Sequence, residues 1–215
     1  MDPVGKGSSH VSAEGGSVFG GKSRDLEFLF EIGSARFIPR AWIQHLGVPV
    51  ASNWEHTVRV IYLALMIARE EKRGDENTII RMALVHDIAE TRTADMAYVH
   101  KVYSKSDEAR AAHDLFEDTT LGDLENVLMK YAERDSIEAK IVKDADNLDI
   151  DIELKEYEEQ GHKLPAKWKK MRKFVRDTKL YTKTAKKMWN KIQKASPAAW
   201  HMKANKWEKV PSAGR

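Results

Sequence analysis

The sequence predicts an all-α fold, and two observations carry this prediction. From Leu26 onward, apolar residues recur at three- and four-residue steps, as they do on one face of a helix. No segment shows the sustained alternation of apolar and polar residues that marks a half-buried strand. The chain has 215 residues, 42% of them hydrophobic, which suits one substantial core. We expect a helical domain over residues 25–196, between a flexible tail (1–24) and a basic extension (197–215).

Composition narrows the class of protein further. The first 24 residues are rich in Gly and Ser and lack the charged segment and apolar run of a secretion signal. No apolar run approaches the roughly 18 residues of a membrane span. The chain has no cysteine, so disulfides and thiolate metal ligands are excluded. These features predict a cytoplasmic protein with no membrane partner.

The first two strongly marked helices are expected at residues 52–74 and 75–90. Ser52 and Glu55 have the S-x-x-E spacing of a capping box, which places His56 in the first turn. Asp75 is a suitable cap for the second helix, and the dipeptide His86-Asp87 then lies near its carboxyl end.

The rest of the chain is also predicted to be helical, apart from a loop over residues 95–105. A helix is expected over 107–131 with an interruption near Gly122, another over 136–160, and a last long one over 165–194. The helix over 136–160 has a periodic apolar stripe, which Asp146 borders: Ile137, Ile141, Ala145, Leu148 and Ile152. The last helix has its own stripe: Trp168, Met171, Val175, Met188 and Ile192.

Charge is divided unevenly along the chain. From residue 161 onward there are 17 Lys and Arg against two acids, although the net charge of the whole chain is only +3. Such a division can mark a nucleic-acid surface, or a basic helix that packs on an acidic body. We favour the packing interpretation, because no nucleic-acid recognition motif accompanies the lysines. We likewise expect Trp189, Trp200 and Trp207 to serve packing or a dimer contact.

Four ionisable residues in otherwise apolar segments point to a metal site. His56, His86, Asp87 and Asp146 carry the nitrogen and oxygen donors that hold first-row divalent cations, and a charge in an apolar segment is costly unless it is compensated. Two imidazoles and two carboxylates would leave positions on the ion open for water and a phosphate oxygen. Taken singly, each His can instead be a hydrogen-bonded core residue, and Asp146 can pair with Lys143.

The order of these donors along the chain resembles the H…HD…D signature of HD-domain metal-dependent phosphohydrolases, over about residues 26–195. The run HDIAETRTAD, which starts at His86, resembles the HDxxExxxxD pattern of the 5'-deoxynucleotidases in that superfamily. The resemblance implies an all-α HD-domain helical bundle, one divalent metal ion and a homodimer. It also implies an activity, the release of phosphate from deoxyribonucleoside 5'-monophosphates.

Carried over by position, the resemblance makes the four donors metal ligands: His56, His86, Asp87 and Asp146. Glu90 would be the acid/base residue beside the attacking water, and Asp95 would contact the substrate or assist departure of the nucleoside. The spacing of Glu90 from His86 supports the same role independently of the resemblance. It follows His86 by four residues, so on a helix both project from one face, where a carboxylate can reach water on the ion. The alternative is an exposed acid paired with Arg92.

The resemblance also suggests residues that bind the substrate. An Arg-Trp pair of the relatives corresponds to Arg40 and Trp42 here, with one residue inserted between them. The planar guanidinium of Arg40 suits a phosphate, and Trp42 can pack against a sugar or base. Tyr98 and Lys101 are expected beside the substrate as well.

Several questions stay open from the sequence. Nitrogen and oxygen donors allow Mn, Co, Fe, Ni, Mg or Zn. Alarmone hydrolases usually show HDxxED, whereas Thr91 follows Glu90 here; triphosphates and cyclic dinucleotides are other candidate substrates. An alternative from another class is a nucleic-acid-binding module with a structural metal site. Finally, Asp146, Asp149 and Glu153 share one helix face and can hold a second cation or, as we favour, receive a basic side chain.

Overall fold

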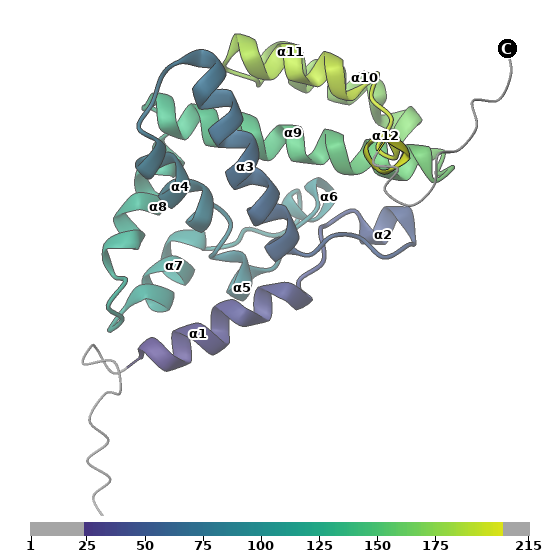
Figure 1. Ribbon diagram of the computed structural model, residues 1–215. Helices are drawn as coiled ribbons and strands as arrows, with labels where there is room; N and C mark the ends of the chain where they lie inside the picture. The colour runs from purple at the N-terminus through teal and green to yellow at the C-terminus, as the bar shows by residue number, and fades with distance from the viewer. Residues whose placement is uncertain (1–23, 204–215) are drawn as a thin grey trace, which may run out of the picture.

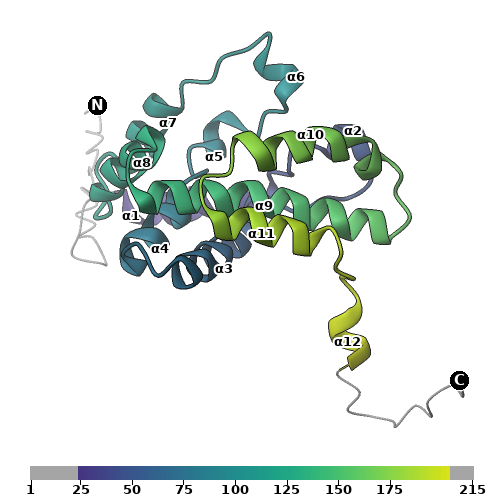
Figure 2. The same cartoon turned by 90° about the horizontal axis from the view of Figure 1, so that it is seen from above.

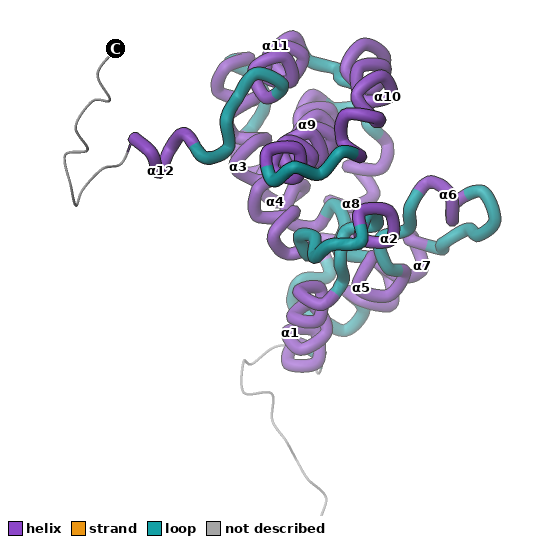
Figure 3. The backbone as a smooth tube through the Cα atoms, turned by 90° about the vertical axis from the view of Figure 1, so that its right-hand side faces the viewer, coloured by secondary structure: helices purple, strands orange, loops and turns teal. Residues whose placement is uncertain are grey.

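The computed structural model describes residues 24–203, and within this range it consists of helices and loops (Figures 1 and 3). The only strand-like pairing there is an isolated bridge between Pro39 and Ser52. The predicted all-α class is therefore confirmed. The amino-terminal helices are α1 (Asp25–Gly33), the 3-10 helix η1 (Ser34–Phe37), α2 (Ile43–Leu46), α3 (Asn53–Glu71), α4 (Glu76–Val85), α5 (Glu90–Thr93) and α6 (Tyr98–Lys101). They are followed by α7 (Glu108–Phe116), α8 (Asp123–Glu133), α9 (Ile137–Glu159), α10 (Leu164–Thr178), α11 (Lys183–Ile192) and α12 (Ala199–Lys203).

Helix α9 lies at the centre of the molecule, and α3, α4, α8, α10 and α11 pack against it (Figures 1 and 2). Its predicted stripe forms the core, since Ile141, Ala145 and Leu148 are fully buried. Five acids on the same helix are buried too: Asp144, Asp146, Asp149, Asp151 and Glu153. A buried carboxylate is stable only when other groups satisfy it. The partners of these acids therefore explain both the fold and the site.

The start of α3 follows the sequence signal. Ser52 is the N-cap, its side chain accepts a hydrogen bond from the amide of Glu55, and the Glu55 carboxylate accepts one from the Ser52 amide. His56 therefore lies in the first turn of α3, as expected. Asp75 caps α4 in the same way through the amide of Thr78. These local hydrogen bonds satisfy amides that the first turn of a helix leaves free.

Helix α4 ends at Val85, so the expected continuous helix to Glu90 is wrong. The chain then forms a tight turn, in which the amide of Ile88 donates to the carbonyl of Val85 and that of Glu90 to the carbonyl of Asp87. These bonds span three residues, the 3-10 spacing that often tightens the end of a helix. The turn holds the HD dipeptide, and Glu90 begins the separate short helix α5.

The predicted helix over 165–194 is also wrong, because it is two helices with a break between Lys179 and Thr182. Asp144 of α9 causes the break. Its two carboxylate oxygens accept hydrogen bonds of 2.7 Å from the amides of Tyr181 and Thr182 and from the Thr182 hydroxyl. Thr182 also caps α11. This long-range contact is invisible to helical periodicity.

The interruption near Gly122 and the segment over residues 95–105 are the remaining features of the helical pattern. The interruption near Gly122 is real, because α7 ends at Phe116 and α8 starts at Asp123. The loop over residues 95–105 contains the short helix α6, which stands away from the helical body (Figures 2 and 3). None of the described helices is long and apolar enough to cross a membrane.

The basic carboxyl-terminal part packs on the acidic helix α9. Arg172 of α10 is buried and makes two hydrogen bonds, of 3.1 and 2.7 Å, to the carboxylate of Asp151. Trp189 of α11 belongs to the core, whereas Trp200 of α12 is exposed and Trp207 lies outside the described residues. All but the last residue of the tail over 1–24, and most of the extension over 197–215, also lie outside them, so the proposed domain division stays a prediction.

Candidate metal centre

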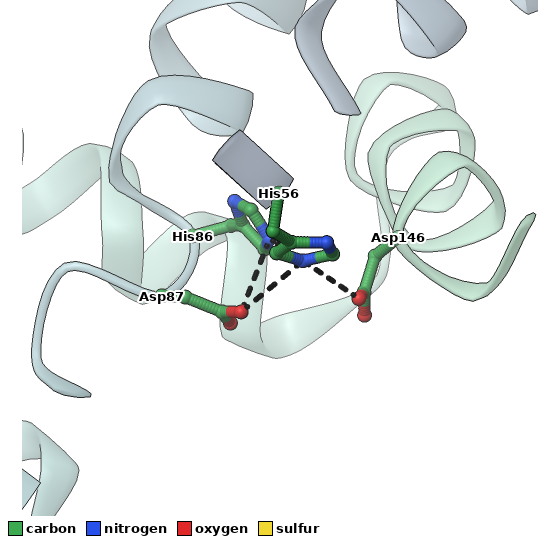
Figure 4. Close-up of side chains that lie close together, drawn as sticks. All are labelled: His56, His86, Asp87 and Asp146. Atoms are coloured by element: carbon green, nitrogen blue, oxygen red, sulfur yellow. Dashed lines mark hydrogen bonds and ion pairs between the residues drawn. The ribbon is translucent and has the colours of Figure 1, made fainter. Parts of the chain in front are cut away.

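Four predicted donors converge on one point between the helices (Figure 4). His56 comes from the first turn of α3, His86 and Asp87 from the turn after α4, and Asp146 from the middle of α9. One donor atom from each residue lies within 4.8 Å of all the others. The structure thus brings together residues that are up to 90 positions apart in the sequence.

The separations between the donor atoms fit a single cation. The Nε2 atoms of His56 and His86 are 3.2 Å apart. Asp87 Oδ2 lies 3.4 and 3.3 Å from these two nitrogens, and Asp146 Oδ1 lies 3.3 Å from His56 Nε2. Two donors that are each about 2.1 Å from an ion, at roughly 90–110° to one another, are separated by about 3.0–3.4 Å. The donor set therefore has the spacing of a coordination sphere.

The outer nitrogens of both imidazoles are already engaged, which aims the inner ones at this point. Nδ1 of His56 lies 2.6 Å from Asp149 Oδ2, and Nδ1 of His86 lies 2.8 Å from the carbonyl oxygen of Ala83. Metal-binding histidines commonly donate their other N–H to a carboxylate or carbonyl, which fixes the ring and makes it a better ligand. Both rings have this arrangement.

The centre also attracts positive charge by itself. Burial alone would lower the pKa of His56, but hydrogen bonds with Asp146, Asp149 and Asp87 outweigh burial and raise that pKa well above its usual range. The surrounding carboxylates therefore favour a proton on His56. A divalent cation would replace that proton.

The carboxylates of α9 divide their oxygens between the centre and basic side chains. Asp146 Oδ1 faces His56, whereas its Oδ2 lies 2.6 Å from Lys143 Nζ. The second oxygen of Asp149 pairs with Arg59, which also contacts Glu156 at 2.9 Å. Asp146 and Asp149 therefore receive basic side chains, as we favoured for this stripe, although Lys143 and Arg59 come from α9 and α3 and not from the basic carboxyl-terminal part. Glu153 instead accepts hydrogen bonds from Trp42, Tyr157 and the Ala51 amide.

Glu90 lies beside the donor set without belonging to it. Its Oε2 atom accepts a hydrogen bond of 2.5 Å from the side-chain amide of Asn53 and lies 3.9 Å from Arg40 Nη1. Burial and the neighbouring carboxylates of Asp87 and Asp95 raise the pKa of Glu90 to about 9. The alternative considered for Glu90, an exposed acid paired with Arg92, is not formed, because Arg92 contacts Glu31 and Asp114.

Arg40 is buried among the carboxylates next to the centre. Its Nη1 atom lies 2.9 Å from Asp95 Oδ2 and 3.4 Å from Asp87 Oδ2. Its Nε atom is buried and has no hydrogen-bond partner among the described residues. Asp95 in turn accepts a hydrogen bond of 3.0 Å from the amide of Ala41. A buried guanidinium with a free donor is suited to an anion that enters the site.

A cavity of about 340 Å³ opens over this group, which is the size of a small-molecule site. The residues that line this cavity include many that we predicted for the site from the sequence: Arg40, Trp42, Asp87, Glu90, Asp95, Tyr98, Lys101 and Asp146. The indole N–H of Trp42 donates to Glu153 Oε2 at 2.9 Å, which fixes the ring in the wall. All the predicted substrate-binding residues therefore line one cavity with the candidate metal ligands Asp87 and Asp146.

Several residues at or next to the metal centre and its cavity were not predicted from the sequence. Asn53 contacts Glu90 and Arg59 contacts Asp149, and the positions of Asn53 and Arg59 near His56 in α3 were the only available signal. His45 and Trp168 also line the cavity. Neither belongs to a motif, so only the fold reveals them.

Comparison with known families identifies the protein class. A family model described as "HD domain" matches residues 32–193. The chain belongs to the HD-domain family. The matched HD-domain range contains all four converging donors as well as Glu90 and Arg40, and it extends from α1 to the end of α11. The family resemblance seen in the sequence is thus confirmed.

Individual HD-domain relatives agree with this assignment. The 5'-deoxynucleotidase HDDC2 of Danio rerio is 31% identical over 142 residues, which cover 62% of this chain and 70% of the relative. The protein of the same name from Homo sapiens is 28% identical over 145 residues, covering 64% of this chain and 70% of the relative. A conserved hypothetical protein from Pyrococcus furiosus shares the fold, with a TM-score of 0.68 and 24% identity, and covers 80% of this chain and 100% of that one.

Proposed function

We propose that this HD-domain protein is a metal-dependent phosphohydrolase that releases inorganic phosphate from deoxyribonucleoside 5'-monophosphates. The observation that carries the proposal is the convergence of four nitrogen and oxygen donors, two of which, Asp87 and Asp146, line a cavity together with Arg40 and Glu90. The relatives named 5'-deoxynucleotidase support the choice of substrate.

The four converging side chains would hold one divalent cation: His56, His86, Asp87 and Asp146. When bound, such a cation polarises a phosphoryl oxygen and makes water a stronger nucleophile at neutral pH. A donor set of two nitrogens and two oxygens is compatible with Mn, Co, Fe, Ni, Mg or Zn. We propose no choice among them.

Arg40 and Lys101 would bind the phosphate, and Trp42 would lie against the sugar. Arg40 now faces three carboxylates, and a phosphate dianion can take up the donor that lacks a partner. Lys101 at the end of α6 adds positive charge to the same cavity. The ring of Trp42 lies near the guanidinium of Arg40, 5.0 Å from ring centroid to Cζ, so phosphate and sugar would have adjacent subsites.

Glu90 would handle the proton of the attacking water. In the step, the water oxygen forms a bond to phosphorus, the bond from phosphorus to O5' breaks, and Glu90 accepts the proton that the water loses. A cation held by the four donors would compensate the charge of Asp87 and so lower the pKa of Glu90, whose carboxylate could then accept that proton. Asn53 holds the carboxylate in place. The leaving O5' would gain the proton that Glu90 has taken from the water, and Asp95 would contact the substrate or assist departure of the nucleoside.

Phosphate release from a panel of compounds tests the proposal. The panel contains deoxyribo- and ribonucleoside 5'-monophosphates, triphosphates, an alarmone and a cyclic dinucleotide, each with and without added divalent ions. We expect turnover of the deoxyribonucleoside monophosphates that depends on the ion. Turnover of none of them, together with tight, salt-sensitive DNA binding, would instead support a nucleic-acid-binding module.

We also propose a homodimer in the cytoplasm. Three apolar side chains at four-residue steps on α3 are exposed and offer a surface for a second copy: Val58, Tyr62 and Met66. Light scattering coupled to size-exclusion chromatography tests the dimer. The cytoplasmic location rests on the cysteine-free sequence and stays a prediction.

A further inference from the structure

The cavity over the donor set has an aromatic end that the proposed chemistry does not use. The rings of His45 and Tyr98 lie nearly parallel, with an interplanar angle of 27° and centroids 6.1 Å apart. The Trp168 ring meets His45 edge-on, at 89° and also 6.1 Å. All three side chains line the same cavity as Glu90 and Asp146.

These rings come from parts of the fold far apart in the sequence. His45 belongs to α2, Tyr98 begins α6 and Trp168 lies on α10. Apolar side chains of α10 continue the wall, and one of them, Met171, remains 47% exposed although it lines the cavity. Tyr98 is 67% exposed. A concave apolar wall with this much accessible aromatic surface is typical of a ligand site.

His45 also carries a polar atom with no partner. Its Nε2 atom is buried from solvent, and no described residue hydrogen-bonds to it. A buried polar atom without a partner has lost its hydrogen bonds to water and gained none in return, so proteins rarely keep one. A ligand that hydrogen-bonds to Nε2 would remove this cost.

The aromatic end of the cavity and the end near Arg40, where the phosphate would bind, are both formed by residues 40–45 and 95–98. Arg40 pairs with Asp95 at 2.9 Å, and a few residues further along each segment His45 faces Tyr98. Trp42 lies between Arg40 and His45 in the sequence, and the Trp42 carbonyl accepts a hydrogen bond of 2.9 Å from the His45 amide. The cavity is therefore polar and charged near Arg40 and aromatic near His45.

We propose that His45, Tyr98 and Trp168 form a subsite for the heteroaromatic base of a nucleotide. The inference rests on the proposed function, because it assumes that the phosphate of the same nucleotide binds near Arg40 at the other end of the cavity. The base packs against the Tyr98 and Trp168 rings, and its edge hydrogen-bonds to His45 Nε2. An imidazole nitrogen can donate or accept, so it can meet either kind of group on a base edge.

The test compares deoxyribonucleoside 5'-monophosphates with 2-deoxyribose 5-phosphate, which has the same phosphate and sugar but no base. The readout is the ratio of the two kcat/KM values. In His45→Ala and in Trp168→Ala, we expect this ratio to fall about tenfold, the effect of losing one hydrogen bond or one stacking contact worth about 1.4 kcal/mol. The matched controls are His113→Ala and Trp200→Ala, whose exposed rings lie outside the cavity, and we expect them to keep the wild-type ratio.

A ratio within twofold of wild type in both cavity variants overturns the subsite. If His45→Ala does not fold, Trp168→Ala carries the comparison. A second measurement titrates deoxyadenosine and thymidine into wild-type protein and Trp168→Ala in the presence of a chelator. We expect saturable binding to wild type that the variant weakens at least fivefold, and equal binding by both proteins overturns the proposal.

The nucleoside titration also separates the two proposals. A nucleoside has no phosphate, and the chelator removes any need for the metal centre. Absence of all turnover together with nucleoside binding that depends on Trp168 would refute the proposed function and retain the base subsite. Turnover of deoxynucleotides with an unchanged ratio would refute the subsite and retain the function.

Discussion

Asp149 Oδ2 lies 2.6 Å from Nδ1 of His56, and both side chains are fully buried. The other carboxylate oxygen of Asp149 is held by Arg59. Asp149 thus fixes the His56 ring while its own orientation is fixed from outside. A chain of contacts therefore runs from the ion pair of Arg59 and Glu156 at the surface, through Asp149, to the His56 ring, whose Nε2 atom faces the other donors.

Asp149→Asn should weaken divalent-ion binding about 10- to 100-fold, because the neutral amide removes the charge that makes His56 a better ligand. Ion titration by calorimetry measures the affinity. Glu156→Gln is the matched control, since Glu156 contacts Arg59 but has no contact with His56. Wild-type affinity in Asp149→Asn would contradict the proposed role of this carboxylate.

Asp87→Ala and Glu90→Gln should separate ion binding from turnover. Asp87→Ala removes one of the four converging donors, so both the ion and the activity should be lost. Glu90→Gln should keep the ion and lower kcat about 10²- to 10⁴-fold, the usual range for losing a general acid or base. Ion content by elemental analysis and phosphate release give the two readouts. Full activity in Glu90→Gln would show that another group handles the proton.

The sequence was informative where a signal is local or depends on residue type. The capping box at Ser52 predicted the start of α3, and this placed His56 in its first turn. Histidines and aspartates in apolar segments marked the four donors, because a buried charge requires compensation. The spacing along the chain could not show that they meet; packing of α3 and α4 on α9 brings them together.

The break between α10 and α11 and the role of His45 were missed for the same physical reason, which is that each depends on a contact made only in the folded chain. Helical periodicity continues through residues 179–182, but Asp144 of α9 binds the amides there and ends the helix. Likewise, the role of His45 depends on rings from α6 and α10. Neither relationship leaves a pattern in the neighbouring residues, so neither was predictable from the sequence alone.

Without a bound ion, the protein should become less stable as the pH rises from about 6 to 9. Burial and the carboxylates of Asp87 and Asp95 raise the folded-state pKa of Glu90 to about 9, from an ordinary value of 4.5. Between these values the folded carboxyl keeps its proton while the unfolded one has lost it, so each rise in pH favours unfolding. His56 acts in the same direction, because its raised pKa gives stability that is present below pH 6.5 and is lost as the pH rises through the folded-state pKa.

Thermal melting in the presence of a chelator checks this pH dependence. Glu90→Gln carries no titrating group at this position, so the fall in Tm between pH 6 and 9 should be smaller than in wild type. Glu27→Gln changes an exposed glutamate and should melt with the wild-type slope. Equal slopes in Glu90→Gln and wild type would contradict the raised pKa.

Asp144→Ala should destabilise the protein by about 2–4 kcal/mol, measured as the free energy of unfolding in urea. Asp144 is fully buried, and its removal leaves the amides of Tyr181 and Thr182 without their acceptor, at about 1–3 kcal/mol for each unsatisfied group. Because these amides form the break between α10 and α11, the loss should also loosen α10, which carries Trp168. Asp177→Ala is the control, since Asp177 is exposed and pairs only with the adjacent Arg176 among the described residues. A loss below 1 kcal/mol in Asp144→Ala would mean that the break is set by the residues of the break themselves and not by α9.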